Sequence, residues 1–294
     1  VVLKADAGGG GRGIRRCNND SEVTQAFTDA AREAQSAFGN AALYLEKYIV
    51  GGRHIEFQVL GDGRGNAIHL GERECSIQRR HQKLLEEAPS PMMSDEQRNH
   101  YGDLSAKAAA SFNYAGAGTI EYLLDEDGSL FFLEMNTRLQ VEHPVSESIT
   151  GIDLMQQQII IAAGGSLPCT QGEVTFKGHA IELRVNAEDT NDDFRPTPGQ
   201  LTSFTINGDG IRFDTHLQAG DSVPPFYDSL LGKVIAHADT REQCIKMLVA
   251  AIGEADIEGL PTTLGLQRDI LLSDDFKNAR CDTLWLDSFL SGNK

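Results

Sequence analysis

The segment from Glu134 to Pro144 gathers acids, amides, an arginine and a histidine within eleven residues. It follows the apolar run Leu130–Leu133, which is typical of a buried strand. Polar groups gathered at the end of a strand can hold a metal ion, an anion and a base close together. The residue types alone leave a second interpretation open, in which this is a solvated polar face on a half-exposed sheet.

Two carboxylates near this segment are expected to lie close together. The turn signal at residues 125–128, between two apolar runs, predicts a β-hairpin. A two- or four-residue loop pairs Glu121 with Phe132. Glu134 and Asn136 then share the face of Glu121, with the two acids roughly 6–8 Å apart at Cβ. A three-residue loop would put the acids on opposite faces.

Glu121 and Glu134, placed so close, would repel each other unless a cation lay between them. Oxygen ligands with an amide nearby suit Mg²⁺ or Mn²⁺, which commonly bridge protein groups to phosphate oxygens. The segment therefore predicts a divalent metal site that includes Glu121, Glu134 and Asn136.

A glycine-rich loop, Ala7–Gly13, follows the first predicted strand, Val1–Asp6. Successive glycines let backbone N–H groups approach phosphate oxygens because no Cβ stands in the way, and Lys4 adds positive charge. The loop matches the dinucleotide fingerprint only formally and lacks the Lys-Ser/Thr pair of a P-loop. We predict a glycine flap over a triphosphate, with a plain flexible loop as the alternative.

The segment Glu72–Lys83 ends in a basic island, although the chain has a formal net charge of -17. Nucleic-acid binding normally needs a broad basic face, which this acidic chain does not offer. A local basic group instead fits a small anionic ligand with a phosphate or carboxylate group. Because acids are interleaved with these bases, a surface ion-pair strip is the alternative.

Composition favours a cytoplasmic enzyme. The 294 residues exceed one average domain, and 40% of them are hydrophobic, which is enough for substantial cores. No apolar run approaches the length of a membrane span. The five cysteines are scattered, odd in number and lack a Cys-x-x-Cys pair, which favours free thiols in a reducing cytosol over a zinc site. Neither a nucleic acid nor a membrane is expected as a partner.

The order of predicted elements indicates an α+β fold. A break of Gly, Ser and Pro residues at 164–168 separates a mixed region from a β-rich one at about 177–238. The expected helices lie at about 21–38, 95–112, 152–163, 241–253 and 264–272, and the second expected strand at 42–48.

Several segments, in this order, resemble the biotin carboxylases of the ATP-grasp superfamily. Lys4 with the glycine loop is similar to the phosphate-covering loop of ATP-grasp enzymes. Segment 46–56 is similar to the hinge beside adenine and the strand after it. Glu72–Lys83 and Glu134–Val145 resemble biotin carboxylase signatures, and His179–Asp189 resembles the start of the C-terminal domain of that family. The similarity extends to about residue 290.

The resemblance implies an ATP-grasp fold followed by a β-rich biotin carboxylase C-terminal domain. Residues 1–50 would be the C-terminal half of the lid with its glycine flap, 51–170 the catalytic body, and 175–292 the C-terminal domain. The N-terminal α/β domain of the family is expected to be absent, because Val1 lies inside a predicted strand.

The resemblance also implies a reaction in two stages. ATP and bicarbonate form carboxyphosphate, and the carboxyl group then passes to biotin held on a carrier protein. The expected cofactors are ATP, Mg²⁺ or Mn²⁺, and biotin. The expected partners are a biotin carboxyl carrier protein or domain, a carboxyltransferase component and a second copy of the chain in a homodimer.

Roles of single residues follow from the resemblance. Glu142 would deprotonate bicarbonate, Arg184 would stabilise the biotin enolate, and Lys83 would assist in the same pocket. Bicarbonate would be held by Arg138, Gln140 and the amide of Val141, and the metal by Glu121, Glu134 and Asn136. ATP would be bound by Lys4, Gly9, Gly10, Gly11, Glu46, Lys47, Ile49, His54, Gln78 and His81.

Elementary chemistry agrees with these roles. A guanidinium fork matches planar bicarbonate, a carboxylate can take its proton, and a fixed cation stabilises an enolate oxygen. Two alternatives stay open: another ATP-grasp ligase that joins a carboxylate to an amine, and a non-catalytic nucleotide-binding module. The isolated 294 residues are expected to be weakly active or inactive.

Overall fold

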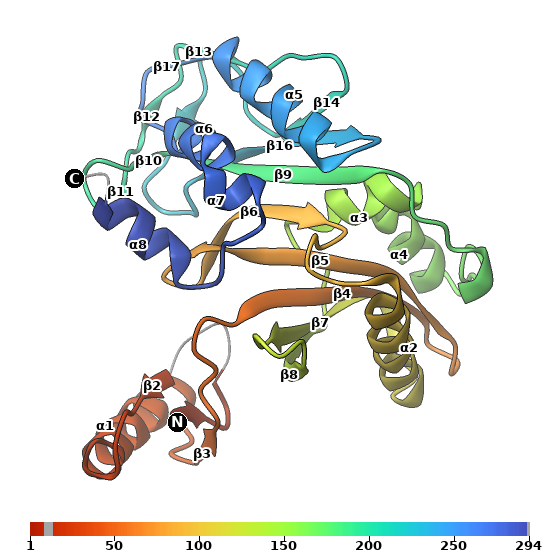
Figure 1. Ribbon diagram of the computed structural model, residues 1–294, viewed down its shortest axis with the longest axis vertical. Coiled ribbons are helices and arrows are strands. Elements are labelled where there is room, and N and C mark those ends of the chain that lie inside the picture. The colour runs from red at the N-terminus through yellow and green to blue at the C-terminus, as the bar shows by residue number, and fades with distance from the viewer. Residues whose placement is uncertain (9–13, 293–294) are drawn as a thin grey trace. The chain divides into compact units, whose positions relative to one another are not determined.

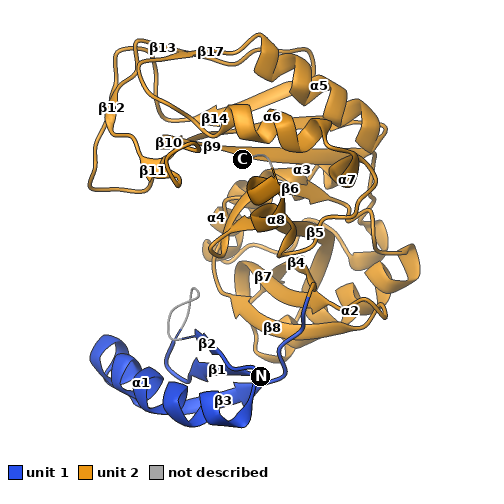
Figure 2. Cartoon of the chain, turned by 60° about the vertical axis from the view of Figure 1, so that its left-hand side comes forward, with its two compact units in different colours: residues 1–50 blue, residues 51–294 orange. Residues whose placement is uncertain are grey.

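The computed structural model describes residues 1–8 and 14–292. These residues divide into two compact units, Val1–Val50 and Gly51–Lys294, which Figure 2 colours blue and orange. Gly9, Gly10 and Gly11 of the predicted flap lie outside the described residues. Among the described residues, no helix is both long and apolar enough to cross a lipid bilayer.

The described residues of the smaller unit form one helix and a three-stranded antiparallel sheet of order β2-β1-β3. Helix α1 begins where the Asn19 side chain accepts the backbone N–H of Glu22, and it ends at Gly39, whose positive φ of 72° suits glycine. The helix starts one residue before the predicted position. The elements are β1 (Val2–Ala5), β2 (Ile14–Arg16), α1 (Asp20–Phe38) and β3 (Leu43–Glu46).

The larger unit is built on one antiparallel sheet of eight strands, in the order β14-β16-β9-β6-β5-β4-β7-β8 (Figure 1). Strand β6 of the predicted catalytic body pairs directly with β9 of the predicted C-terminal domain. The strands are β4 (Arg53–Asp62), β5 (Ala67–Arg79), β6 (Gln82–Ala88), β7 (Ala115–Leu124), β8 (Leu130–Asn136), β9 (His179–Asn186), β14 (Ile211–Thr215) and β16 (Leu230–Ala238).

Helices and short strands cover and extend this sheet. The helices are α2 (Asp95–Ser111), α3 (His143–Thr150), α4 (Leu154–Ala162), η1 (Gln171–Glu173), α5 (Arg241–Gly253), α6 (Leu264–Leu272), α7 (Asp274–Lys277) and α8 (Trp285–Gly292). The short strands are β10 (Glu188–Asp189), β11 (Arg195–Pro196), β12 (Gly199–Gln200), β13 (Ser203–Thr205), β15 (Ser222–Val223) and β17 (Asp256–Glu258).

Strand β4 directs apolar side chains to one face of the sheet and polar side chains to the other. Alternate residues Ile55, Phe57 and Val59 join an apolar core with residues of α2, which packs against β4 and β5 (Figure 1). The residues between them, Glu56 and Gln58, are also buried but point to the opposite face. Helix α3 contacts β5, β6 and β9. Polar side chains that are buried in a sheet need partners, and these lie on the face of Glu56.

The predicted hairpin is present, but its predicted register is wrong. The Asp125 N–H donates to the Ser129 carbonyl at 2.9 Å, so the loop has three residues. Such a loop alone would put Glu121 and Glu134 on opposite faces. A β-bulge at Leu133 inserts one extra residue, and Glu121 pairs directly with Glu134 instead of Phe132. The shared face of the two acids therefore depends on the bulge and not on the loop.

The prediction of a buried strand at Leu130–Leu133 is also wrong. β8 is the last strand of the sheet and has β7 as its single neighbour there. Phe131 and Phe132 are 40% and 64% exposed. Consecutive aromatic residues suggested burial on both faces, whereas an edge strand is covered less completely.

Leu183→Ala is expected to destabilise the chain by about 2–5 kcal/mol, because Leu183 is 0% exposed in the core beside β9 and a cavity would remain. Leu104→Ala, the same substitution at a position 45% exposed on α2, is the matched control and should cost less than about 1 kcal/mol. Urea denaturation of both variants measures the difference. Equal losses would contradict the assigned core.

Candidate active site

A fully buried arginine lies at the centre of the polar face of the sheet. Arg73 is 0% exposed, and its Nε donates to Glu56 Oε1 at 2.5 Å. Burial disfavours its charge, but Glu56 and Glu142 outweigh that effect and raise the pKa of Arg73. Its remaining donors reach Gln58 Oε1 at 2.6 Å, Ser146 Oγ at 3.0 Å and Thr119 Oγ1 at 3.1 Å. Arg73 thereby joins β4, β5, β7 and α3.

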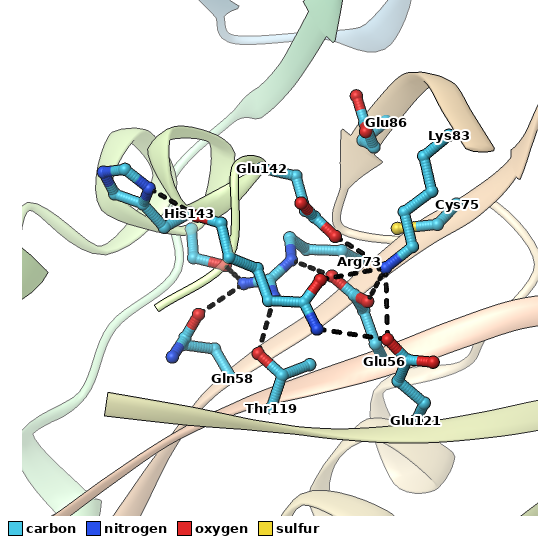
Figure 3. A network of polar contacts seen from close by, with 12 residues as sticks. Glu56, Gln58, Arg73, Cys75, Lys83, Glu86, Thr119, Glu121, Glu142 and His143 are labelled. Atoms are coloured by element: carbon cyan, nitrogen blue, oxygen red, sulfur yellow. Dashed lines mark hydrogen bonds and ion pairs between the residues drawn. The ribbon is translucent and has the colours of Figure 1, made fainter. Parts of the chain in front are cut away.

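Lys83 extends this network toward the start of α3 (Figure 3). Its Nζ lies between three carboxylates, in contact with Glu56 Oε2, at 2.6 Å from Glu142 Oε1 and at 3.3 Å from Glu121 Oε1. It also donates to Gln140 Oε1 at 3.1 Å. The side chain of Lys83 is 10% exposed, so its ammonium group is held by protein acceptors.

The charges of this cluster stabilise one another. Burial alone would raise the pKa of Glu56, but Arg73 and Lys83 hold it at about 2. Burial likewise opposes the charge of Glu121, but His54, Lys83 and Gln140 lower its pKa to about 2. For Lys83 burial favours the neutral form, but Glu56 and other acids raise its pKa well above the ordinary value. Both acids are therefore ionised at neutral pH, and Lys83 is charged.

The three predicted metal ligands come together at the β7–β8 hairpin. Glu121 lies directly opposite Glu134, and Asn136 Nδ2 donates to Glu121 Oε1 at 2.9 Å. His54 Nε2 lies 3.2 Å from Glu121 Oε2. His54, Glu56 and Glu121 each offer a ligand atom within 4.8 Å of the others. Paired carboxylates with an amide form the oxygen-rich donor set that Mg²⁺ or Mn²⁺ prefers.

The predicted bicarbonate residues lie on the segment that joins β8 to α3. Arg138 is exposed, and its Nη1 donates to the Leu139 carbonyl at 3.4 Å. Gln140 is buried and donates to Glu121 Oε1 at 3.1 Å. The carbonyl of Val141 accepts a hydrogen bond from Lys233 Nζ at 2.7 Å. Lys233 thus fixes the backbone of this segment.

Glu142 occupies the residue before α3 without capping that helix with its side chain. Its carboxylate is fully buried, with Lys83 on Oε1 at 2.6 Å and Arg184 Nη2 on Oε2 at 2.9 Å. Arg184, on β9, also donates from Nε to Glu86 Oε1 at 2.6 Å. Burial opposes the charge of Arg184, but Glu86 and Glu142 raise its pKa. A carboxylate held between two cations can accept a proton from a bound acid once one of these contacts opens.

Among the predicted nucleotide-binding residues of the larger unit, His54 and Gln78 contact each other, whereas His81 lies in an exposed turn. Gln78 Nε2 contacts His54 Nδ1 at 2.7 Å and the Cys75 carbonyl at 2.7 Å, so these two side chains orient each other. His81 is exposed in the β5–β6 turn, with a positive φ of 66°. In the smaller unit Lys4 pairs with Glu46, Lys47 is exposed and Ile49 is buried.

The interpretation of Glu72–Lys83 as a surface ion-pair strip applies to Arg79 and Arg80, whereas Lys83, at the same basic end, is only 10% exposed and lies in the charge cluster. Arg79 and Arg80 both pair with Asp193. Glu72 and Glu74, however, are buried on β5, and Glu72 accepts hydrogen bonds from Arg98. The strip is therefore confined to the turn.

Arg73, Glu56 and Lys233 were missed by the sequence analysis as site residues. Glu56 and Gln58 alternate with apolar residues in a ten-residue strand, and this pattern signals a polar face that needs partners. Arg73 lies in a similar strand, but no spacing rule says which of several acids it meets. The long-range contact of Lys233 with Val141 has no local sequence signal.

Two protein families cover most of the chain. Residues 1–170 match the family described as carbamoyl-phosphate synthase L chain, ATP binding domain. Residues 182–288 match the biotin carboxylase C-terminal domain.

Individual relatives agree with these matches. A biotin carboxylase of Nostoc sp. is 51% identical over 284 residues, which are 96% of this chain and 64% of the relative. A chloroplastic biotin carboxylase of Arabidopsis thaliana is 50% identical over 287 residues, 97% of this chain and 53% of the relative. The chain thus spans between about half and two thirds of these relatives.

Solved structures are similar as well. The biotin carboxylase domain dimer of Hydrogenobacter thermophilus 2-oxoglutarate carboxylase, in complex with MgADP, ADP and bicarbonate, has a TM-score of 0.93 and 48% identity, covering 98% of this chain and 64% of that one. A biotin carboxylase of Campylobacter jejuni has a TM-score of 0.93 and 44% identity, with coverage of 98% and 64%. The chain therefore belongs to the biotin carboxylases, an ATP-grasp family with an α+β fold.

Proposed function

We propose that the protein containing this chain carboxylates carrier-bound biotin, using ATP and bicarbonate, through carboxyphosphate. The observation that carries the proposal is the buried Glu142, held between Lys83 and Arg184 at one end of the bicarbonate segment. Such a carboxylate can take a proton, and its two cations can stabilise the charges that form when the proton moves.

In the first stage bicarbonate would bind to the segment 138–141. The exposed guanidinium of Arg138 can form two parallel hydrogen bonds to the planar anion, assisted by Gln140 and the amide of Val141. Glu142 would remove the proton as bicarbonate attacks the terminal phosphate of ATP, whose bond to ADP breaks and leaves carboxyphosphate. Lys83, whose Nζ contacts Glu142, would stay protonated and stabilise negative charge in this pocket.

In the second stage Arg184 would stabilise the enolate form of biotin. Its charge is permanent, and its guanidinium is anchored on Glu86, so it can present a fixed positive group to the developing oxygen anion. The carboxyl group would then pass from carboxyphosphate to the ureido nitrogen of biotin as its bond to phosphate breaks, and the released phosphate would take the proton of that nitrogen.

ATP would be bound by Lys4, Gly9, Gly10, Gly11, Glu46, Lys47, Ile49, His54, Gln78 and His81. The metal would be held by Glu121, Glu134 and Asn136, where it would neutralise phosphate charge.

The wider assembly is likewise part of the proposal. Residues 1–50 would form half of the lid, 51–170 the catalytic body and 175–292 the C-terminal domain. The expected partners are a biotin carrier, a carboxyltransferase and a second copy of the chain, in the cytoplasm. Support comes from the Hydrogenobacter thermophilus relative, whose biotin carboxylase domain is described as a dimer.

Glu142→Gln and Arg138→Ala are expected to lower biotin-stimulated ADP release by about 10²–10³-fold in the full-length protein, because each removes a group that acts in the transition state. Bicarbonate-dependent ATP cleavage with Mg²⁺ and free biotin measures the effect. Glu254→Gln and Arg268→Ala change exposed residues of the same types and should leave the rate unchanged. ATP cleavage that biotin does not stimulate would instead favour another ATP-grasp ligase.

Glu134→Gln is expected to raise the Mg²⁺ concentration for half-maximal ATP cleavage by about tenfold or more, since one metal oxygen ligand loses its charge. High Mg²⁺ should restore part of the rate. The control is Glu126→Gln, in the exposed turn of the same hairpin. An unchanged Mg²⁺ requirement would remove Glu134 from the metal site.

A further inference from the structure

Two fully buried acids face each other behind the proposed catalytic arginine. Glu86 on β6 pairs directly with Glu182 on β9, and both are 0% exposed. Residues directly opposite in an antiparallel pair point to the same face, with Cβ atoms roughly 4.5–5.5 Å apart. Arg184, two residues beyond Glu182, shares this face and binds Glu86.

These two carboxyl groups differ in their hydrogen bonds. Glu86 Oε1 accepts from Arg184 Nε at 2.6 Å, but Glu86 Oε2 has no donor among the described residues. Both oxygens of Glu182 likewise lack a partner there. Two ionised carboxylates in this position would repel each other, and burying an unpaired charge costs several kcal/mol. One proton on Glu182 would remove the repulsion and provide the donor that Glu86 Oε2 lacks.

The surrounding charges favour a proton on Glu182 rather than on Glu86. Burial raises the pKa of Glu182 well above its ordinary value, and Glu86 and Glu142 raise it further, against Lys233 and Arg184. Lys233, on β16, donates its hydrogen bond to the Val141 carbonyl instead.

Glu86, in contrast, has a cation in direct contact, Arg184. Burial raises its pKa to about 7, with Glu142 acting in the same direction, while Arg184 and Lys83 oppose the rise. The titratable groups at the start of α3, which packs on this face, are Glu142 and His143, and burial lowers the pKa of His143, leaving it neutral. The direct contact with Arg184 Nε favours the ionised form of Glu86.

We propose that Glu182 is a neutral carboxylic acid that donates a hydrogen bond to Glu86 Oε2, and that the ionised Glu86 positions Arg184 beside Glu142. The role of Arg184 rests on the proposed function, whereas the protonation of Glu182 does not. When Glu142 takes up a proton, its contact with Arg184 weakens. Glu86 keeps its charge and holds the guanidinium in place through that step.

Protonation is tested first, on the 294-residue chain itself. Infrared spectra at neutral pH should contain a protonated-carboxyl band that Glu182→Gln removes, and in the unaltered chain this band should disappear as the pH is raised. In Glu86→Gln the band should titrate at a lower pH, because the neighbouring negative charge is gone. Glu74→Gln, which removes another buried acid whose pKa burial raises, should leave this component intact. A band unchanged by Glu182→Gln would overturn the proposal.

A measurement on the unaltered chain avoids dependence on variants that fold poorly. Carboxyl ¹³C resonances of labelled glutamate count the side chains that are still protonated at pH 7. At least one glutamate side chain should be protonated at pH 7. A count of zero would contradict the proposal.

The proposal also predicts the direction in which thermal stability changes with pH. The folded pKa of Glu182 is raised, so its contribution to stability is fully present below the unfolded pKa and is lost as the pH rises through the folded pKa. Above the unfolded pKa the Tm of the wild type should therefore fall relative to Glu182→Gln, by roughly 2–4 °C per pH unit, until Glu182 is ionised in the folded chain. Parallel curves would show that Glu182 does not titrate differently on folding.

Activity tests the positioning role. In the full-length protein Glu86→Gln should lower kcat for biotin carboxylation about tenfold or more, while ATP cleavage without biotin and the KM for ATP stay unchanged. Glu182→Gln, which keeps a neutral donor, should retain kcat. Equal losses in both reactions would assign Glu86 a general structural role. A wild type inactive toward biotin would refute the proposed function and leave the infrared result standing.

Discussion

The interaction on which the rest of the site depends is the buried ion pair between Arg73 and Glu56. A guanidinium without solvent must have almost all its donors satisfied by protein, and the acceptors of Arg73 come from three separate parts of the sequence, β4, β7 and α3. Because a buried arginine without its partners would cost several kcal/mol, alternative registers of β4, β5 and β7 are disfavoured. The ion pair thus helps to specify the register of these strands rather than simply adding stability.

This constraint extends to the chemistry. Glu56 accepts from Arg73 with one oxygen and from Lys83 with the other, so the ammonium group is placed by a residue that is itself fixed. Lys83 in turn orients Glu142, and Glu142 meets Arg184. A chain of alternating charges therefore runs from β5 across β6 to β9. Each member has a partner of opposite sign, which lets many ionised groups share a small buried volume.

The sequence allowed the elements to be predicted better than their registers. Helices at 241–253 and 264–272 were predicted with the observed bounds, because periodic apolar residues are a local signal. The bulge at Leu133 has no such signal, since it is selected by the pairing of two strands, and it reversed the outcome that the loop length alone would give. The wrong loop length and the missed bulge had opposite effects on the β7–β8 register, so Glu121 and Glu134 still share a face at the predicted metal site. That cancellation was not foreseeable from one sequence.

Site residues in one contiguous segment were predictable, whereas residues joined through space were not. The acids and amides of 134–142 were identified because they follow one another after a strand. Arg73, Glu86 and Lys233 act through contacts made by strands that are distant in the chain, and these became apparent only in the folded sheet. The glycines at 9–11 lie outside the described residues, so their predicted role stays a prediction.

The pairing of β6 with β9 has a consequence for how the larger unit can be divided. The two strands belong to regions that match different families, yet they are neighbours in one continuous sheet. A chain cut between residues 173 and 179 would leave two unprotected edges, each presenting a row of free backbone donors and acceptors. Such edges recruit other strands, so the separated halves would tend to aggregate rather than behave as exchangeable modules. Each region therefore supplies the strands that complete the sheet of the other.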